Sequence, residues 1–404
     1  MASTIVLSIV FTISLWFIFW LLILYFQHTE NIKKCLLEPM FKFPIVIFES
    51  DDWGTGSFNQ QTALTRINTL LAQYTDSTGS HPVMTLGVIL AEPDVAKIKA
   101  SNQQIYYKRT LADSRYAKLR EAIQQGIDQG TFAVHLHGME HFWPASLMQS
   151  AQNNPQVQQW LFNNDSLQTE DLPSELQSRW VDSSQIPSRE HSPEDIQRAI
   201  DEELSLYAEI FGQTPKIVVP PTFVWTDEVE KAYAARGIEV WITPGRQCTG
   251  RDKQRLPKPN GRLFWNGQEQ GGLLFLVRNN YFEPSIGHTA ETALQGILAK
   301  TQCGRPALLE THRFNFIDET ENNSSLQELD KLLQLMHTHL PNVRFMSVTQ
   351  LAKIMKDHNR GITTEVIVDS KRQRTRILFA RIKSLLQFNR IAKYSGINFL
   401  LKAV

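Results

Sequence analysis

Hydrophobic and polar positions alternate in a regular order from residue 43 onward. Short apolar runs, rich in β-branched residues, are each followed by a longer segment with helical spacing. We expect strands at 43–48, 82–90, 132–134, 216–219, 238–242, 272–278, 306–311 and 343–346, and helices at 60–73, 112–128, 193–211, 226–236, 289–301, 324–340 and 348–357. This alternation is typical of a parallel α/β fold, and the pattern leaves open whether the sheet closes into a barrel or stays open and doubly wound.

The first part of the chain has a different pattern. Residues 4–26 form an apolar run without a charge, and a bilayer crossing takes about 20 such residues. The basic start and small-residue cleavage site of a signal peptide are not evident, so residues 1–35 are expected to be a retained single-pass transmembrane anchor. Lys33 and Lys34 follow the run, and this charge bias favours a cell-membrane protein with its domain on the cytoplasmic side.

The last segment, residues 361–404, is basic. After Asp369 it contains only basic charged residues, and Leu378, Ile382, Leu385 and Leu386 recur at helical spacing. We expect a basic amphipathic helix that lies on an anionic membrane surface, so that lipid is a partner at both ends of the chain. The alternatives are a basic helix packed back on the domain, or a disordered tail.

Composition narrows the function classes. The 404 residues are 42% hydrophobic, enough for a sizeable core in residues 36–360. Lys+Arg and Asp+Glu both number 41, so bulk charge gives no reason to expect a nucleic-acid partner. The three cysteines lack a CxxC spacing, which argues against a disulfide framework and against a cysteine zinc site.

Two adjacent acids stand where the first strand of the domain is expected to end. Asp51 and Asp52 follow the apolar run 43–48, and Gly54 comes directly after them. Sites in parallel α/β folds are built at the carboxyl ends of the strands. The alternative is a helix cap with a solvated neighbour, since Asp is a good cap.

Histidines follow two other expected strands. His137 and His141 are four residues apart, a spacing that places both rings on one face of a helical turn, and His312 closes the strand at 306–311. Two histidines and one carboxylate suit a divalent metal, with Zn²⁺ the one expected. A second carboxylate could then act as a general base on water. His135 is expected to support the site without binding the metal.

These motifs, in this order, resemble the polysaccharide deacetylase family, carbohydrate esterase family four, with its NodB homology domain. The resemblance covers residues 43–357 and implies a distorted (β/α) barrel that hydrolyses acetyl groups on sugars with a divalent metal. It implies that Asp51 is the general base, that Asp52, His137 and His141 bind the metal, and that His312 is the general acid. Residues 211–221 resemble the third motif of the family, which would place the oxyanion donor at the backbone amide of Thr222.

The sequence departs from the family pattern at two places. The first motif reads Glu49-Ser50-Asp51-Asp52-Trp53, with its glycine one place late. Val219 stands where the third motif has an arginine that orients the base. Arg246, Arg278 or Arg313 could supply the missing cation, and the sequence does not choose among them.

Residues 142–190 are expected to be a long irregular insertion over the site. Its aromatic residues could be sugar platforms or the small core of the insertion itself. They are Phe142, Trp143, Trp160, Phe162 and Trp180. Trp53 and Trp225 are further expected substrate contacts, and Glu49 is expected beside the site.

The leading hypothesis is a membrane-anchored, metal-dependent hydrolase that deacetylates a cell-envelope polysaccharide or glycolipid. One alternative keeps the metal but cleaves another C–N bond or a glycosidic bond. The other is a catalytically idle protein that binds glycan and organises an assembly at the membrane. The missing arginine favours the idle protein, whereas five polar groups at strand ends, which are costly to hold together, oppose it.

Overall fold

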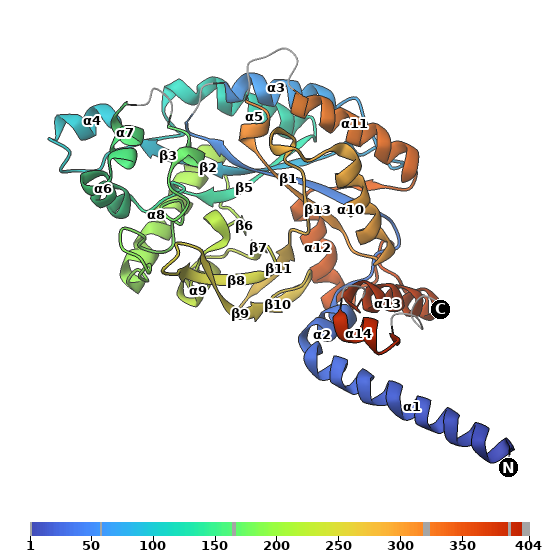
Figure 1. The fold of residues 1–404 in the computed structure, drawn as a ribbon. Coiled ribbons are helices and arrows are strands. Elements are labelled where there is room, and N and C mark those ends of the chain that lie inside the picture. The colour runs from blue at the N-terminus through green and yellow to red at the C-terminus, as the bar shows by residue number, and fades with distance from the viewer. Residues whose placement is uncertain (1, 57–58, 164–166, 318–323, 387–388, 398–404) are drawn as a thin grey trace.

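A computed structural model describes residues 2–56, 59–163, 167–317, 324–386 and 389–397. Its centre is a curled sheet in which almost all neighbouring strands are parallel, with helices around it (Figure 1). The strand order is β10-β11-β7-β6-β5-β2-β1-β13-β12, and β14 also pairs with β1. The expected distorted (β/α) barrel is therefore confirmed as the fold class.

The expected strands and helices are present, most within two or three residues of their predicted bounds. The strands of the sheet are β1 Ile45–Gly54, β2 Met84–Ile89, β5 Phe132–Gly138, β6 Ile217–Val218, β7 Val240–Thr243, β10 Gln268–Gln270, β11 Leu273–Val277, β12 Asn280–Tyr281, β13 Ala307–His312 and β14 Arg344–Phe345. The helices around it are α3 Gln60–Leu71, α5 Ala117–Asp128, α8 Pro193–Phe211, α9 Asp227–Ala235, α10 Ala290–Gln302, α11 Ser324–His339 and α12 Val348–Asn359. Two small antiparallel sheets of two strands each were not predicted. They are β3 Ala91–Pro93 with β4 Lys108–Thr110 and β8 Arg246–Arg251 with β9 Pro257–Leu263.

The two faces of the sheet bury different sets of side chains. The outer face packs against the surrounding helices in the larger core. The inner face is apolar in its lower half, where Ile47 and Leu308 pack with Leu351 and Met355 of α12. Further along the same two strands the inward residues are polar. In the parallel register, Glu49 is paired with Glu310 and Asp51 with His312. The inside of the curled sheet is therefore filled with apolar side chains at one end and lined with polar side chains at the other.

The two edges of the sheet are joined by a very short connection. β11 lies near one edge and β12 at the other, yet only Arg278 and Asn279 separate them in the chain. The Arg278 N–H donates to the carbonyl of Thr243, and the Asn279 N–H donates to that of Leu308. These two residues form a seam where the edges meet, and the Arg278 side chain enters the interior from it.

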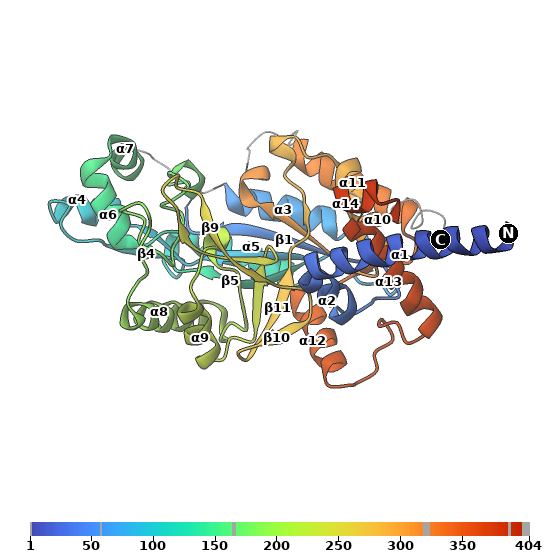
Figure 2. The same ribbon diagram turned by 60° about the horizontal axis from the view of Figure 1, so that its bottom comes forward.

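The N-terminal and C-terminal helices pack together away from the sheet (Figures 1 and 2). They are α1 Ala2–Gln27, α2 Thr29–Leu37, α13 Lys371–Leu386 and α14 Arg390–Tyr394. Residues Ile5–Gln27 of α1 are long and apolar enough to cross a membrane, by length and composition.

The expectation that the C-terminal helix lies on a membrane with its apolar face is wrong for α13. Ile377 packs with Met40 and Val368, and Leu386 packs with Leu24 of α1. Arg381 is 1% exposed, and its guanidinium donates to the backbone carbonyls of five residues. These acceptors are Cys35, Glu38, Pro39, Cys303 and, at 3.4 Å, Gly304. The apolar face is thus occupied by the protein itself, which is the alternative stated above.

The segment 142–190 is more ordered than its composition predicts. It contains α6 Pro144–Asn153 and α7 Pro155–Asn163, which pack with α4 Val95–Ala100 around a separate core. Phe142 and Trp160 belong to that core, Phe162 packs against it, and Trp180 lies in the main core. These four aromatic residues therefore serve as core residues, which is the second of the two alternatives given above. We call this helical unit the cap subdomain.

Candidate metal centre and its surroundings

The end of β1 delivers two neighbouring acids to one place. Adjacent residues of a regular strand point to opposite faces, but the pairing of β1 with β2 is irregular between Ser50 and Trp53. Asp52 lies there with a φ of +70°. A bulge of this kind re-aims a side chain, so both Asp51 and Asp52 reach the interior.

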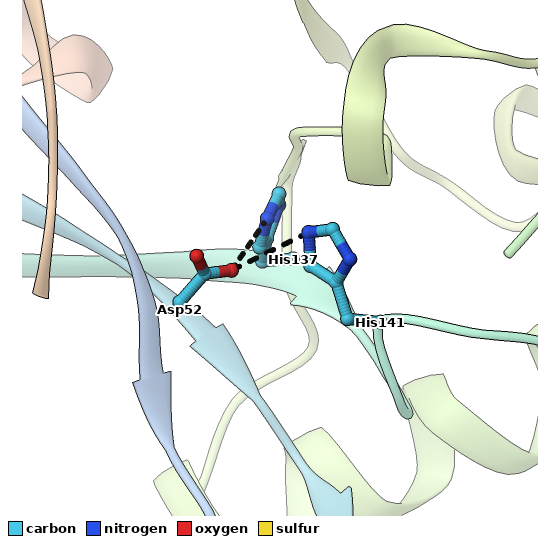
Figure 3. Close-up of side chains that lie close together, drawn as sticks. All are labelled: Asp52, His137 and His141. Carbon is cyan, nitrogen blue, oxygen red and sulfur yellow. Dashed lines mark ion pairs between the residues drawn. The ribbon is translucent and has the colours of Figure 1, made fainter. Parts of the chain in front are cut away.

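Asp52, His137 and His141 bring their donor atoms together (Figure 3). Asp52 Oδ1 lies 3.3 Å from His137 Nε2 and 3.4 Å from His141 Nε2, and the three donor atoms are all within 4.8 Å of one another. All three side chains are buried. His137 is the next-to-last residue of β5, and His141 lies three residues after the strand in a non-helical segment, so the prediction of a helical turn from the four-residue spacing is wrong.

The hydrogen bonds around this cluster fit a divalent metal. His137 Nδ1 donates to the carbonyl of Val219 at 2.8 Å, which leaves Nε2 free as a ligand. Burial lowers the pKa of His141 to about 4, so that its ring is neutral at pH 7. Asp52 Oδ1 is buried and has no hydrogen-bond partner among the described residues, although an unpaired buried carboxylate oxygen is costly. A bound cation would resolve that cost.

Arg278 is the cation that faces Asp51. Its Nη1 lies 2.5 Å from Asp51 Oδ2 and its Nη2 lies 2.8 Å from Oδ1, while Nε lies 3.2 Å from Glu49. Burial raises the pKa of Asp51, but the Arg278 charge outweighs it and holds that pKa well below its usual range. Of the other two candidates, Arg246 is exposed and Arg313 pairs with Glu170. Of the three candidate cations, Arg278 is therefore the one that contacts Asp51.

His312 is held by a residue that the sequence did not reveal. Its Nδ1 lies 2.6 Å from Glu283 Oε1, and Asn315 donates to the other oxygen of Glu283. Burial lowers the pKa of His312, but the Glu283 hydrogen bond and the nearby Asp52 charge raise it to about 10. His312 is therefore a protonated imidazolium at neutral pH. No motif marks Glu283, because it lies in a connection after β12.

Two expected support residues lie where the sequence predicted. His135 Nε2 is 3.9 Å from Asp51 Oδ1, and burial lowers the pKa of His135 to about 4. Glu49 lies below Asp51 on the same strand, and burial raises its pKa to about 7 against the opposing effect of Arg278. Gly87 of β2 leaves space for Asp51, since a Cβ there would lie 2.4 Å from Asp51 Oδ1.

Two expected substrate contacts are corrected by the structure. Trp53 and Trp225 are both 0% exposed and belong to the outer core. Trp53 Nε1 donates to Ser50 Oγ, and Trp225 Nε1 donates to Glu230. Both rings therefore serve packing, Trp53 from the outward face of β1 and Trp225 from the segment directly before α9.

Trp143 and Thr222, the other two residues expected to contact the substrate, are not among the buried residues of the outer core. Trp143 is half-buried and stacks on His191 with ring centroids 3.9 Å apart. Thr222 follows β6 with a φ of +53°, and its hydroxyl lies 2.7 Å from Ser178 Oγ. An L-residue held in this conformation marks a constrained backbone of the kind found at functional sites.

A family model, glycosyl hydrolase family 57, matches residues 176–361, less than half of the chain. No curated protein sequence matches this chain. Among solved structures, the peptidoglycan deacetylase PdaC of Bacillus subtilis is 11% identical, with a TM-score of 0.38 and coverage of 79% of this chain and 95% of that one.

Two further solved structures are similar to the chain. A family 4 acetyl xylan esterase of Clostridium thermocellum, solved in complex with a cobalt ion, is 13% identical, with a TM-score of 0.36 and coverage of 79% and 93%. A putative polysaccharide deacetylase of Mycobacterium smegmatis is 12% identical, with a TM-score of 0.41 and coverage of 83% and 100%. The motifs at Asp51-Asp52, His137-x-x-x-His141 and His312 carry the resemblance of the chain to the polysaccharide deacetylase family.

Proposed function

We propose that this protein is a metal-dependent hydrolase that removes acetyl groups from a sugar of a cell-envelope polysaccharide or glycolipid. The observation that carries the proposal is the buried Asp52–His137–His141 cluster beside an Asp51 that Arg278 keeps ionised. The helix Ile5–Gln27 would hold the domain at the membrane, and the proposal assigns the domain to neither side of that membrane.

Each residue of the site has a distinct task in this reaction. A divalent metal held by Asp52, His137 and His141 would act as a Lewis acid toward the acetyl carbonyl and toward water. Asp51 accepts the proton of the attacking water, and Arg278 keeps it ionised and oriented for that step. The backbone N–H of Thr222 donates to the oxygen that gains negative charge.

His312 completes the cycle as the general acid. When the C–N or C–O bond to the acetyl group breaks, His312 gives its proton to the leaving sugar nitrogen or oxygen, and acetate is released. Glu283 keeps His312 protonated until then. Asp51 and His312 are directly paired in the register of β1 and β13, and this pairing supports the proposal that they act together as base and acid.

Acetate release from acetylated sugars tests the proposal. The wild-type full chain, loaded with Zn²⁺, should release acetate, and Asp51→Asn should lower the rate by about 10²–10⁴-fold while metal content stays unchanged. Acetate release that persists in Asp51→Asn would refute the role of the base. A chain that binds metal and glycan without releasing acetate would indicate the idle assembly protein.

A glycosidic hydrolase is the second candidate, favoured by the family 57 match. That match covers Glu283, Glu310 and His312 but none of the three metal-cluster residues. Glycosidases use a pair of carboxylates that flank the scissile bond. Release of reducing sugar that persists in Asp52→Asn and is lost in Glu283→Gln would favour this reaction over deacetylation.

A further inference from the structure

A groove lined by both polar and apolar side chains lies outside the metal cluster. It has a volume of about 550 Å³ and runs between α13 and the end of α10. The residues that line it are Phe41, Lys42, Ala299, Thr301, Gln302, Cys303, Gln373, Arg376, Ile377, Ala380, Lys383 and Ser384. We call it the α13 groove.

The charge of the α13 groove is positive. Arg376 and Lys383 are seven residues apart, two turns on one face of α13, and both are exposed. Lys42 contributes from the other wall and is 3.4 Å from Asp369, which is itself 69% exposed. The lining residues include no acid. The groove thus presents three cations to solvent, and one of them, Lys42, is paired with the exposed Asp369.

More positive charge lies behind the wall. Burial lowers the pKa of Lys34, and the charge of the neighbouring Arg305 adds to this effect. Glu38 acts in the opposite direction and raises that pKa. Burial and Arg305 likewise lower the pKa of Lys300, which lies in the last turn of α10. Glu38 is buried and pairs with Arg305, so it does not reach the groove as a free charge. This crowding of cations favours an anionic ligand.

The position of the groove indicates where that anion comes from. Leu386, two residues after Ser384 of the groove, packs with Leu24 near the end of the candidate membrane span. Trp16 Nε1 of the span donates to the carbonyl of Ser395, beyond α14. Figure 2 shows α13 and α14 beside the C-terminal part of α1. If α1 spans the bilayer, the groove opens at the level of the lipid headgroups.

We infer that the α13 groove binds the headgroup of an anionic phospholipid. Arg376, Lys383 and Lys42 would contact the phosphate, because arginine and lysine are the usual phosphate partners. Hydroxyl and amide groups of Ser384 and Gln373 can bind the polar headgroup. Phe41, Ile377 and Ala380 offer apolar contact to the glycerol backbone and the first acyl carbons.

The inference uses the anchor of the proposed function and none of its chemistry. It also differs from a helix that lies on the surface, because the apolar residues of α13 are used for packing and the lipid is met by its polar side. The bound lipid would fix the orientation of the domain at the membrane. Loss of acetate release and loss of lipid binding are therefore independent outcomes.

Native mass spectrometry of the full chain, released from detergent micelles, tests the inference. The protein is given an equal mixture of phosphatidylglycerol and phosphatidylcholine, and the adducts of each are counted. We expect a single favoured phosphatidylglycerol adduct. Because each basic residue near a lipid surface contributes a factor of about five, the double variant Arg376→Gln/Lys383→Gln should weaken that adduct by about 20–30-fold.

The matched control removes the same charge elsewhere on the same helix. Lys371→Gln/Arg372→Gln changes two exposed residues that do not line the groove, and it should keep the adduct. Equal loss in the two double variants, or equal binding of the two lipids, would overturn the inference. So would inorganic phosphate or an acidic peptide that displaces phosphatidylglycerol at an equal concentration, since the site would then take free anions.

Discussion

Arg278 donates to both carboxylate oxygens of Asp51, although 227 positions separate the two residues in the chain. The contact exists because the chain crosses from β11 to β12 at the seam and brings Arg278 next to β1 and β13. The same guanidinium also reaches Glu49, so one cation serves two buried carboxylates. Asp51, the proposed base, is thus contacted by an arginine of the seam between β11 and β12, and not by a residue at position 219 as the resemblance implied.

Replacement of Arg278 should change both stability and the pH profile. Loss of the cation leaves Asp51 buried without compensation, so Arg278→Gln should lower the free energy of unfolding by about 3–5 kcal/mol. The pKa of Asp51 should rise, since Arg278 is what lowers it. The acidic limb of kcat/KM against pH should therefore move to higher pH, as measured by acetate release.

The matched control is Arg246→Gln, which removes an exposed arginine that could also have been the missing cation. It should leave both the unfolding free energy and the acidic limb unchanged. Arg278→Lys should restore part of the stability but not the rate, because a lysine cannot donate to both oxygens of Asp51. An unshifted acidic limb in Arg278→Gln would mean that Asp51 is not the base.

The sequence predicted the fold and the metal cluster better than it predicted their surroundings. Strand ends could be read from apolar runs, so Asp51, Asp52, His137 and His312 were found. Contacts between distant segments, such as Arg278 with Asp51, carry no local signal. Burial of a tryptophan beside a motif, as for Trp53, depends on which face of the sheet a bulge presents.

The secondary structure of the cap subdomain was missed for a different reason. Its helices α6 and α7 are short and rich in Gln and Asn, and their apolar positions are too few for a clear helical period. They are stabilised by packing with α4, which comes from another part of the chain. Tertiary contacts decided this segment, as they decided the orientation of α13.

The metal cluster predicts a stability that depends on the metal. A ligand that binds only the folded state at 100 times its Kd stabilises it by about 2.7 kcal/mol. Zn²⁺ should therefore raise the Tm of the wild-type chain, and His141→Ala or Asp52→Asn should abolish that rise and the bound metal. Differential scanning fluorimetry and elemental analysis measure the two effects.

His358→Gln is the control for the loss of a histidine, because His358 lies on α12 at the closed end of the barrel. It should keep the full metal content and the full rise in Tm. Stoichiometric Zn²⁺ in His141→Ala would contradict the assignment of the cluster.

Glu283→Gln should move the basic limb of the pH profile. Glu283 raises the pKa of His312, so without its charge His312 loses its proton at lower pH. The basic limb of kcat should shift toward neutral pH and the rate at pH 8 should fall by about tenfold or more. An unchanged basic limb would exclude His312 as the acid.

The same pair makes a prediction for stability. The folded-state pKa of His312, about 10, lies above its ordinary value near 6.5. Its pairing with Glu283 therefore stabilises the fold fully below pH 6.5 and loses that effect as the pH rises through 10. Chemical denaturation should show a larger difference between wild type and Glu283→Gln at pH 6 than at pH 10.5.

Gly87→Ala should displace the base without removing the metal. The new Cβ would lie 2.4 Å from Asp51 Oδ1, too close for any real contact, while Asp52 lies beyond it on the bulge. We expect a loss of acetate release similar to that of Asp51→Asn, with Zn²⁺ content unchanged. Full activity of Gly87→Ala would show that Asp51 need not occupy the position described.

Arg381→Ala should release the C-terminal helices from the domain. Arg381 of α13 is buried, and its guanidinium donates to backbone carbonyls in and after α2 and to one directly after α10. Hydrogen bonds from a charged group contribute about 1.5–3 kcal/mol each. The variant should lower Tm and become sensitive to trypsin between residues 360 and 376, with metal content retained. Arg374→Ala, an exposed residue of the same helix, should change neither property. Equal protease resistance of the two variants would show that apolar contacts at Ile377 and Leu386 suffice to hold α13.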